Sequence, residues 1–157
     1  MRVEFLPAEI PADLRRLTDF DRKVFPSDYF PASEWRRYQS WWLLLNGSRV
    51  GCCAFEPNVD FADDLAADNP PRAGCLYIAS TGILPAFRSQ GLGQIFKAWQ
   101  IAYAKHHGFQ RIVTNTRSRN RAMIALNRKF GFNVLRTTPR YYRDPTDSTV
   151  VMELHLR

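Results

Sequence analysis

The sequence predicts a single domain of the mixed α/β class, and three observations support this prediction. The chain has 157 residues, a length that suits one hydrophobic core of ordinary size. Strand-like segments are interspersed with amphipathic helical segments, and no linker, repeat or low-complexity stretch divides them. In the second half a buried strand, a helix and a further strand follow one another, which predicts two parallel strands in a βαβ unit. We therefore expect residues 1–157 to form one domain.

The N-terminal part predicts a strand followed by two helices. Residues 2–6 alternate weakly between apolar and polar side chains, as a strand does. Beyond Pro11, apolar residues recur at spacings of three and four as far as Val24, and Pro26 follows. An amphipathic helix is therefore expected between the two prolines. Residues 33–40 predict a short second helix.

A hairpin is the next predicted feature. Residues 41–45 and 49–55 are both strand-like, and Asn46 and Gly47 lie between them. Asparagine followed by glycine is the strongest short hairpin signal, because both residues tolerate a positive φ. Residues 56–73 collect Pro, Asp, Asn and Ala without a clear period, which predicts a mobile loop.

The second half of the chain carries the strongest patterns. Residues 74–84 are apolar at nearly every position, as expected of a central strand that is covered on both faces. A long amphipathic helix is predicted over 91–107, and a strand over 109–114. The remaining predicted elements are a helix over 120–130 and strands over 132–138 and 149–156.

Charge and composition favour some classes of partner and exclude others. The formal net charge is +7 and the sequence pI is about 9.7, a balance that favours anionic partners such as a phosphorylated cofactor or nucleic acid. No apolar run approaches the roughly 20 residues of a membrane span, and no signal peptide is recognisable. We therefore expect a soluble, cytoplasmic protein with no membrane partner. Cys52, Cys53 and Cys75 lack metal-ligand spacing, which predicts buried free thiols and no bound metal.

The segment from Arg88 to Gly93, RSQGLG, lies between the strand over 74–84 and the helix that follows it. The first N–H groups of a helix lack internal partners, the helix dipole adds partial positive charge, and glycine lets the backbone approach a ligand closely. These properties suit a phosphate group, and Arg88 adds a formal charge. The residues match neither a Walker A loop nor a Rossmann loop. The segment therefore predicts a phosphate-binding turn of another kind.

Two signatures resemble those of the GCN5-related N-acetyltransferase (GNAT) family. The first runs from Thr81 to Gly93, TGILPAFRSQGLG, and is similar to the family's motif A. The second begins at Asn120 and continues through 126–132, LNRKFGF, which is similar to the family's fourth helix and the glycine–aromatic turn that closes it. They stand in the family's order, about 30 residues apart, as a crossover and a helix require. The order of elements resembles the family over essentially the whole chain.

This resemblance implies a GNAT-like fold and a cofactor site. Members have a mixed, mostly antiparallel sheet with helices on both faces, and the parallel fourth and fifth strands splay around the cofactor. The implied co-substrate is acetyl-CoA or another acyl-CoA, with its pantetheine arm along the fourth strand and its pyrophosphate on the loop. The cofactor-binding residues implied by position are Thr81, Gly82, Ile83, Arg88, Ser89, Gln90, Gly91, Leu92, Gly93, Gln94, Asn120 and Asn127. Asn120 is also a favourable helix N-cap, and one residue can serve both roles.

The catalytic positions depart from the family pattern. Where many members carry a tyrosine as general acid, this chain has Asn127, whose amide has no useful acidity. Where some members carry a glutamate as general base, this chain has Asn115 or Tyr77. Tyr141 and Tyr142 are expected in the loop between the last two strands. The candidates left open for proton transfer are Tyr77, Asn127, Tyr141, Tyr142 and Glu56, together with acids of the early helices such as Asp28 and Glu34.

The resemblance implies an enzyme that transfers an acyl group from acetyl-CoA to a primary amine by direct attack on the thioester. The acceptor is left open between a small molecule and a protein amine, and a homodimer is also left open. The alternative function is a catalytically silent acyl-CoA-binding sensor or interaction module, which the asparagines at the catalytic positions motivate. A third reading, a nucleic-acid-binding domain, is prompted by the pI alone, and nucleic acid is not the partner we expect.

Overall fold

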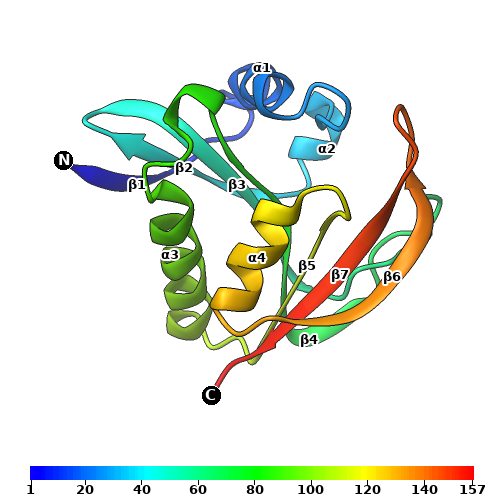
Figure 1. The fold of residues 1–157 in the computed structure, drawn as a ribbon. Helices are drawn as coiled ribbons and strands as arrows, with labels where there is room; N and C mark the ends of the chain where they lie inside the picture. Colours follow the sequence, from blue (N-terminus) through cyan, green and yellow to red (C-terminus); the bar gives the residue numbers. More distant parts are fainter. The chain divides into compact units, whose positions relative to one another are not determined.

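The computed structural model describes all 157 residues, and its helices and strands follow the predicted order with one additional short 3-10 helix (Figure 1). The elements are β1 (Val3–Pro7), α1 (Leu14–Val24), α2 (Ala32–Trp35), β2 (Gln39–Leu45), β3 (Ser48–Val59), β4 (Pro71–Ile83), η1 (Pro85–Phe87), α3 (Leu92–His106), β5 (Arg111–Arg117), α4 (Arg121–Lys129), β6 (Asn133–Tyr142) and β7 (Asp147–His155).

The seven strands form one mixed sheet in the order β1-β2-β3-β4-β5-β7-β6. β1 pairs with β2, β2 with β3, β5 with β7 and β6 with β7, all antiparallel. β4 and β5 are parallel, with residues 75–78 paired to residues 111–114, and β4 then runs on to Ile83. The mixed sheet with its parallel pair confirms the predicted fold class. The splayed strands and the helices on both faces stay predictions.

The predicted loop over 56–73 is wrong at both ends. β3 continues to Val59 and β4 already begins at Pro71, so only residues 60–70 connect them. Two irregular positions explain why the strand period was not visible in the sequence. Asn58 and Gly74 both have a positive φ, and the Asn58 side chain accepts a hydrogen bond from the Gly74 N–H. Such irregularities interrupt the alternation of side chains that identifies a strand.

The second helix is also shorter than predicted. It covers only Ala32–Trp35, and Gln39 and Ser40 already belong to β2. By contrast, the predicted hairpin is confirmed, because Leu45 pairs with Ser48 around Asn46 and Gly47. These two turn residues have φ values of 49° and 84°, as a two-residue turn between strands requires.

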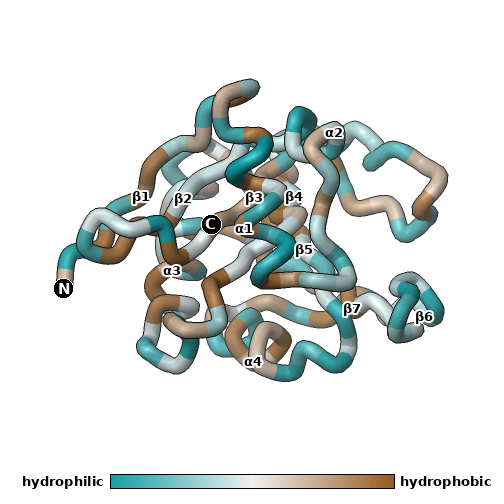
Figure 2. Tube along the Cα trace, turned by 90° about the horizontal axis from the view of Figure 1, so that it is seen from above, coloured by the Kyte–Doolittle hydropathy of each residue, from teal (hydrophilic) through white to brown (hydrophobic).

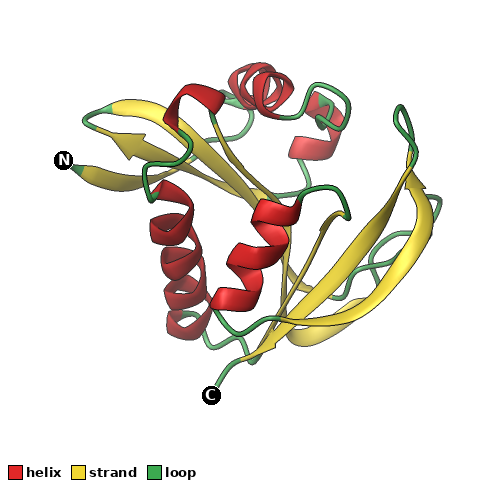
Figure 3. Ribbon diagram, viewed as in Figure 1, coloured by secondary structure: helices red, strands yellow, loops and turns green.

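The chain divides into two compact units, and the first consists of residues 1–56 and 79–93. α1 lies over the first strands of the sheet (Figure 3), and its apolar residues form the core of this unit with those of α2, β2 and β3. The rings of Phe20 and Trp42 meet edge to face at 5.4 Å. The buried residues of this core are Leu14, Leu17, Phe20, Val24, Trp35, Tyr38, Trp42, Cys52 and Ala54.

The second unit consists of residues 57–78 and 94–157. Within it α3 and α4 lie side by side, and Lys129 near the end of α4 donates a hydrogen bond to Gln94 near the start of α3 (Figure 1). Hydrophobic and hydrophilic stretches alternate along α4, as an amphipathic helix requires (Figure 2).

All three cysteines of the chain are free and buried, as predicted. None of the helices is long and apolar enough to cross a membrane.

Candidate functional site

The loop between β4 and α3 has the backbone that the sequence predicts for an anion-binding turn. Ser89 and Gly91 both have a positive φ, of 63° and 81°. A Cβ built on Gly91 would meet no atom within 4 Å, so the space beside this residue is open. Arg88 is exposed, and its Nε donates to the carbonyl oxygen of Ile83 at 3.1 Å. Exposed backbone N–H groups at the start of a helix, with an arginine beside them, fit a phosphate group.

The end of β4, at Thr81, Gly82 and Ile83, lies under the C-terminal end of α1. A Cβ on Gly82 would lie 2.9 Å from Val24 Cγ1 and 3.2 Å from Phe25 Cε2. Gly82 therefore has a packing role in addition to the cofactor contact that the family resemblance implies. The absence of a side chain lets the helix approach the strand.

Replacing Gly82 with alanine is expected to lower the free energy of unfolding by about 1–3 kcal/mol, because the added methyl group overpacks a buried contact. Urea unfolding measures this change. The matched control is Gly91→Ala, whose methyl group enters open space and adds only the strain of a positive φ. Equal destabilisation by both substitutions would show that the α1 contact is not what requires glycine at this position.

The two asparagines of the second signature both lie on or beside α4. Asn120 is the N-cap, and its Oδ1 accepts from the Met123 N–H at 3.2 Å, which confirms the capping role. Asn127 is 1% exposed, and its Nδ2 donates to Met152 Sδ at 3.7 Å. The Oδ1 of Asn127 is buried and has no hydrogen-bond partner in the protein. A buried acceptor without a partner costs about 1–3 kcal/mol, so the protein alone leaves this atom unsatisfied.

A hydrogen-bond network centred on Asn115 joins two of the candidate tyrosines. The Tyr77 hydroxyl donates to Asn115 Oδ1 at 2.6 Å. The Nδ2 of Asn115 donates to the Tyr142 hydroxyl and to Thr149 Oγ1, both at 3.1 Å. The network therefore links β4, β5, β6 and β7 of the second unit. Tyr77 is buried, and Tyr142 is partly exposed.

Tyr141 and Tyr142 do not lie in the loop between β6 and β7, as the sequence suggested, but at the end of β6. The reason is that β6 runs on through Pro139, and bulged pairing between Thr138 and Tyr142 accommodates the proline. The Tyr141 ring packs against Phe61 and Tyr142 at 5.7 Å and 4.8 Å between ring centroids. Phe61 also packs against Tyr77, so these aromatic rings form one cluster beside Asn115.

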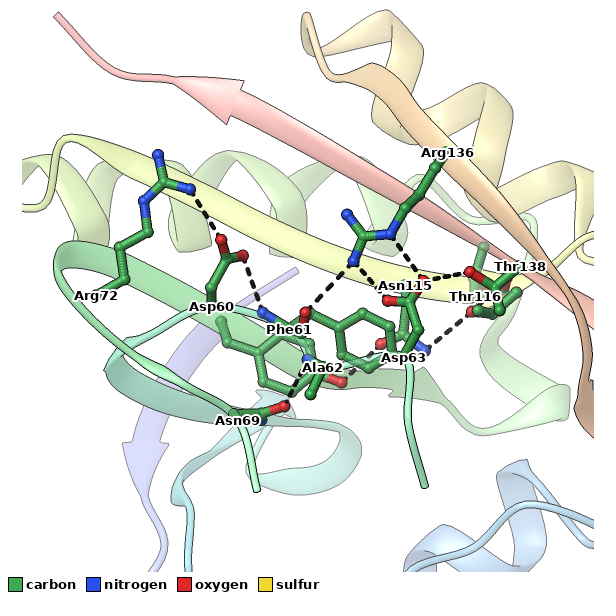
Figure 4. Close-up of polar contacts among 12 residues, drawn as sticks. Asp60, Phe61, Ala62, Asp63, Asn69, Arg72, Asn115, Thr116, Arg136 and Thr138 are labelled. Carbon is green, nitrogen blue, oxygen red and sulfur yellow. Dashed lines mark hydrogen bonds and ion pairs between the residues drawn. The ribbon is translucent and has the colours of Figure 1, made fainter. Parts of the chain in front are cut away.

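The segment 60–70 is held in place within the second unit by arginine–aspartate pairs, two of which Figure 4 draws. Arg136 donates to Asp63, and Thr138 also donates to this carboxylate. These hydrogen bonds from Arg136 hold the pKa of Asp63 below its ordinary value, although burial opposes the shift. On the other side Arg72 donates to Asp60 at 2.8 Å. The pairs position Phe61 in the aromatic cluster.

Asp21 is an unusual acid of the first unit that sequence reasoning missed. It is 3% exposed, and its Oδ2 accepts from the Phe30 N–H at 2.7 Å. Burial, together with the nearby charges of Glu34 and Asp28, raises the pKa of Asp21 to about 7 despite the hydrogen bond from Phe30. The spacing along the helix does indicate that Asp21 is buried. Asp21 follows Leu17 by four residues and therefore lies on the buried face of α1.

The structure places the remaining acid candidates around this region. Glu34 on α2 accepts from the Tyr38 hydroxyl at 2.8 Å, and Asp28 lies between α1 and α2. Glu56 lies on β3 and is partly exposed. Burial first, and then the charge of Glu34, raises the pKa of Tyr38, and Glu56 adds to this shift. Tyr38 is therefore neutral and acts as a hydrogen-bond donor.

Comparison with known proteins identifies one family. The model of the acetyltransferase (GNAT) family matches residues 12–132 of this chain. Among curated proteins, the probable N-acetyltransferase san of Drosophila melanogaster is 29% identical over 146 residues, which cover 91% of this chain and 76% of that protein.

Solved structures show the same fold. The ribosomal-protein-S18-alanine N-acetyltransferase of Escherichia coli aligns with a TM-score of 0.78 at 19% identity, over 98% of this chain and 94% of its own. An acetyltransferase of Bacillus subtilis in complex with CoA aligns with the same TM-score at 15% identity, over 99% of this chain and all of its own.

Proposed function

Because this chain belongs to the acetyltransferase (GNAT) family and is an acetyl-CoA-dependent N-acetyltransferase, we propose that its acceptor is a primary amine that attacks the thioester directly. In this reaction the amine nitrogen forms a bond to the carbonyl carbon and the carbon–sulfur bond breaks. The nitrogen loses one proton, and the CoA thiolate gains one. The match of the family model over residues 12–132 carries this proposal.

We propose that the loop between β4 and α3 holds the pyrophosphate of acetyl-CoA. The open space at Gly91 and the positive φ of Ser89 support this assignment. Thr81, Gly82 and Ile83 would offer main-chain hydrogen bonds to the pantetheine arm. The loop residues in this role are Arg88, Ser89, Gln90, Gly91, Leu92, Gly93 and Gln94.

Asn127 and Asn120 are proposed to contact the cofactor from α4. The support for Asn127 is its buried Oδ1 without a partner, which suits an N–H donor such as an amide of the pantetheine arm. Asn120 already uses its side-chain oxygen as the helix cap, so its Nδ2 is the group we assign to the cofactor. An amide has no useful acidity, so neither residue is assigned a proton-transfer role.

For proton transfer we propose the network of Tyr77, Asn115 and Tyr142. Tyr77 gives its hydroxyl hydrogen to Asn115, so its oxygen is oriented to accept a hydrogen bond from an amine or a water molecule. Tyr142 accepts from Asn115, and its hydroxyl also lies 3.3 Å from Thr149 Oγ1, where either oxygen can be the donor. We assign Tyr77 as the acceptor for the amine proton and Tyr142 as the donor for the leaving thiolate. Tyr141 and Glu56 are weaker candidates.

Tyr77→Phe is expected to lower kcat by about 100-fold, since the positioned acceptor for the amine proton is lost. The Kd for acetyl-CoA should stay unchanged. Thiol release with a panel of amines measures turnover, and calorimetry measures binding. Tyr103→Phe is the matched control, because this α3 tyrosine stacks on His107 outside the network. A Tyr77→Phe enzyme with wild-type kcat would exclude the network from the mechanism. If the wild-type protein released no thiol when amines were added, the silent acyl-CoA-binding module would be favoured instead.

A peptide N terminus is the first acceptor class that we propose to test. The support is a solved structure of the same fold that is named a ribosomal-protein-S18-alanine N-acetyltransferase. Small amines are the second class.

We further propose that residues 1–157 form one catalytic domain, because the family model spans parts of both units. The cytoplasmic location expected from the sequence stays a proposal.

A further inference from the structure

A cavity of about 140 Å³ lies in the second unit near the starts of β4 and β5. Its lining residues are Arg72, Ala73, Gly74, Cys75, Gln110, Arg111 and His155. The residues proposed for acetyl-CoA and for proton transfer are not among them. The cavity is therefore separate from the residues proposed for the acetyltransferase reaction.

Arg111 is the buried charged residue of this cavity, with its side chain 7% exposed. A guanidinium group has five N–H donors. The Nε of Arg111 donates to Glu153 Oε2 at 2.7 Å, and Nη1 donates to Asp60 Oδ1 at 2.9 Å and to Cys75 Sγ at 3.1 Å. These bonds use three donors and fix the orientation of the group. The two N–H groups of Nη2 remain for an acceptor in the cavity.

The two carboxylates that hold Arg111 do not line the cavity. Asp60 and Glu153 remain ionised at neutral pH, because hydrogen bonds from Arg111 hold the pKa of each below its ordinary value against the opposing effect of burial. The lining itself presents donors, since Arg72 contributes a second guanidinium and Gln110 a side-chain amide. The cavity wall thus offers hydrogen-bond donors and no carboxylate.

We propose that this cavity binds a small oxyanion, of the phosphate or carboxylate class. The oxygens of such a ligand would accept from Arg111 Nη2, from Arg72 and from the Gln110 amide. Bonds between a guanidinium and an oxyanion are charge-assisted and directional. The two arginines are balanced by Asp60 and Glu153, so affinity comes from directed hydrogen bonds more than from net charge. We therefore expect a Kd on the order of 1 mM.

The test is an NMR titration of the full-length protein with sodium phosphate and, separately, with sodium citrate, at constant ionic strength set by sodium chloride. The amide signals of Gly74, Cys75, Gln110 and Arg111 should shift saturably with at least one of these anions. Saturation by phosphate alone or by citrate alone identifies the class of ligand. Amides of residues 88–93 report binding at the acetyl-CoA loop separately. Linear shifts, or the same shifts with chloride, would overturn the proposal.

Two variants and one matched control complete the test. Arg72→Gln should raise the Kd at least about fivefold, because it removes a charged donor from the half-exposed rim and leaves Arg111 in place. Gln110→Leu should raise it about threefold through the loss of a neutral donor. Arg136→Gln is the control, because this arginine also pairs with an aspartate of segment 60–70 but lies outside the cavity lining. An Arg72→Gln protein that is folded and binds the anion as tightly as wild type would refute the site.

Discussion

Gly91→Glu is expected to weaken acetyl-CoA binding by at least about 100-fold. The substitution places a carboxylate in the open space beside the residue, where the proposed site holds a pyrophosphate. Two like charges about 4 Å apart repel by roughly 4 kcal/mol at the effective dielectric of a protein surface, which corresponds to about three orders of magnitude in Kd. Calorimetric titration with acetyl-CoA measures the effect directly.

Gly108→Glu is the matched control for this prediction. Gly108 also has a positive φ, 78° against 81° for Gly91, and a Cβ there also meets no atom within 4 Å. The two substitutions therefore add the same charge and a comparable backbone strain. They differ in position, because Gly91 precedes α3 and Gly108 follows it. If Gly108→Glu weakened binding as much as Gly91→Glu, the loss would reflect net charge or folding, and the loop assignment would fail.

The backbone of the loop between β4 and α3 could be predicted from the sequence because its properties are local. A glycine that requires a positive φ, an adjacent arginine and a helix start lie within six consecutive residues, from Arg88 to Gly93. The Asn46-Gly47 hairpin and the Asn120 cap were predictable for the same reason. In each of them the partners lie within a few residues along the chain.

The Asn115 network could not be predicted, because its partners lie on other strands. Tyr77, Tyr142 and Thr149 are 38, 27 and 34 residues away from Asn115 in the chain. Periodicity shows that a side chain faces the sheet's interior but does not show which residue lies opposite it. The register of four strands decides these neighbours, and the register depends on bulges such as the one between Thr138 and Tyr142. Each tyrosine was a candidate alone, and only the fold joins two of them.

The pKa of Asp21 predicts an unusual dependence of stability on pH. The folded-state pKa is about 7, against 3.8 for a solvated aspartate, because burial disfavours the ionised form. Between these values the folded protein keeps the proton and the unfolded chain loses it. The Asp21 contribution to the free energy of unfolding should therefore fall as the pH rises from about 4 to about 7, by on the order of 3–4 kcal/mol, and stay low above pH 7.

Asp21→Asn should remove this dependence, since the amide oxygen can still accept from the Phe30 N–H and carries no charge. In urea unfolding, the variant should exceed wild type by on the order of 3 kcal/mol at pH 8. The advantage should shrink steadily toward pH 4, close to the pKa of a solvated aspartate, because protonation of the unfolded chain there removes most of the difference between the two states. Asp19→Asn is the control, because it makes the same change of side chain on the exposed side of the same helix. If the difference between Asp21→Asn and wild type were the same at pH 4 and pH 8, Asp21 would be ionised in the folded protein. A cation or water molecule near Asp21 would then have to compensate its charge, because Asp28 and Glu34, the neighbouring groups that act on it, are acids as well.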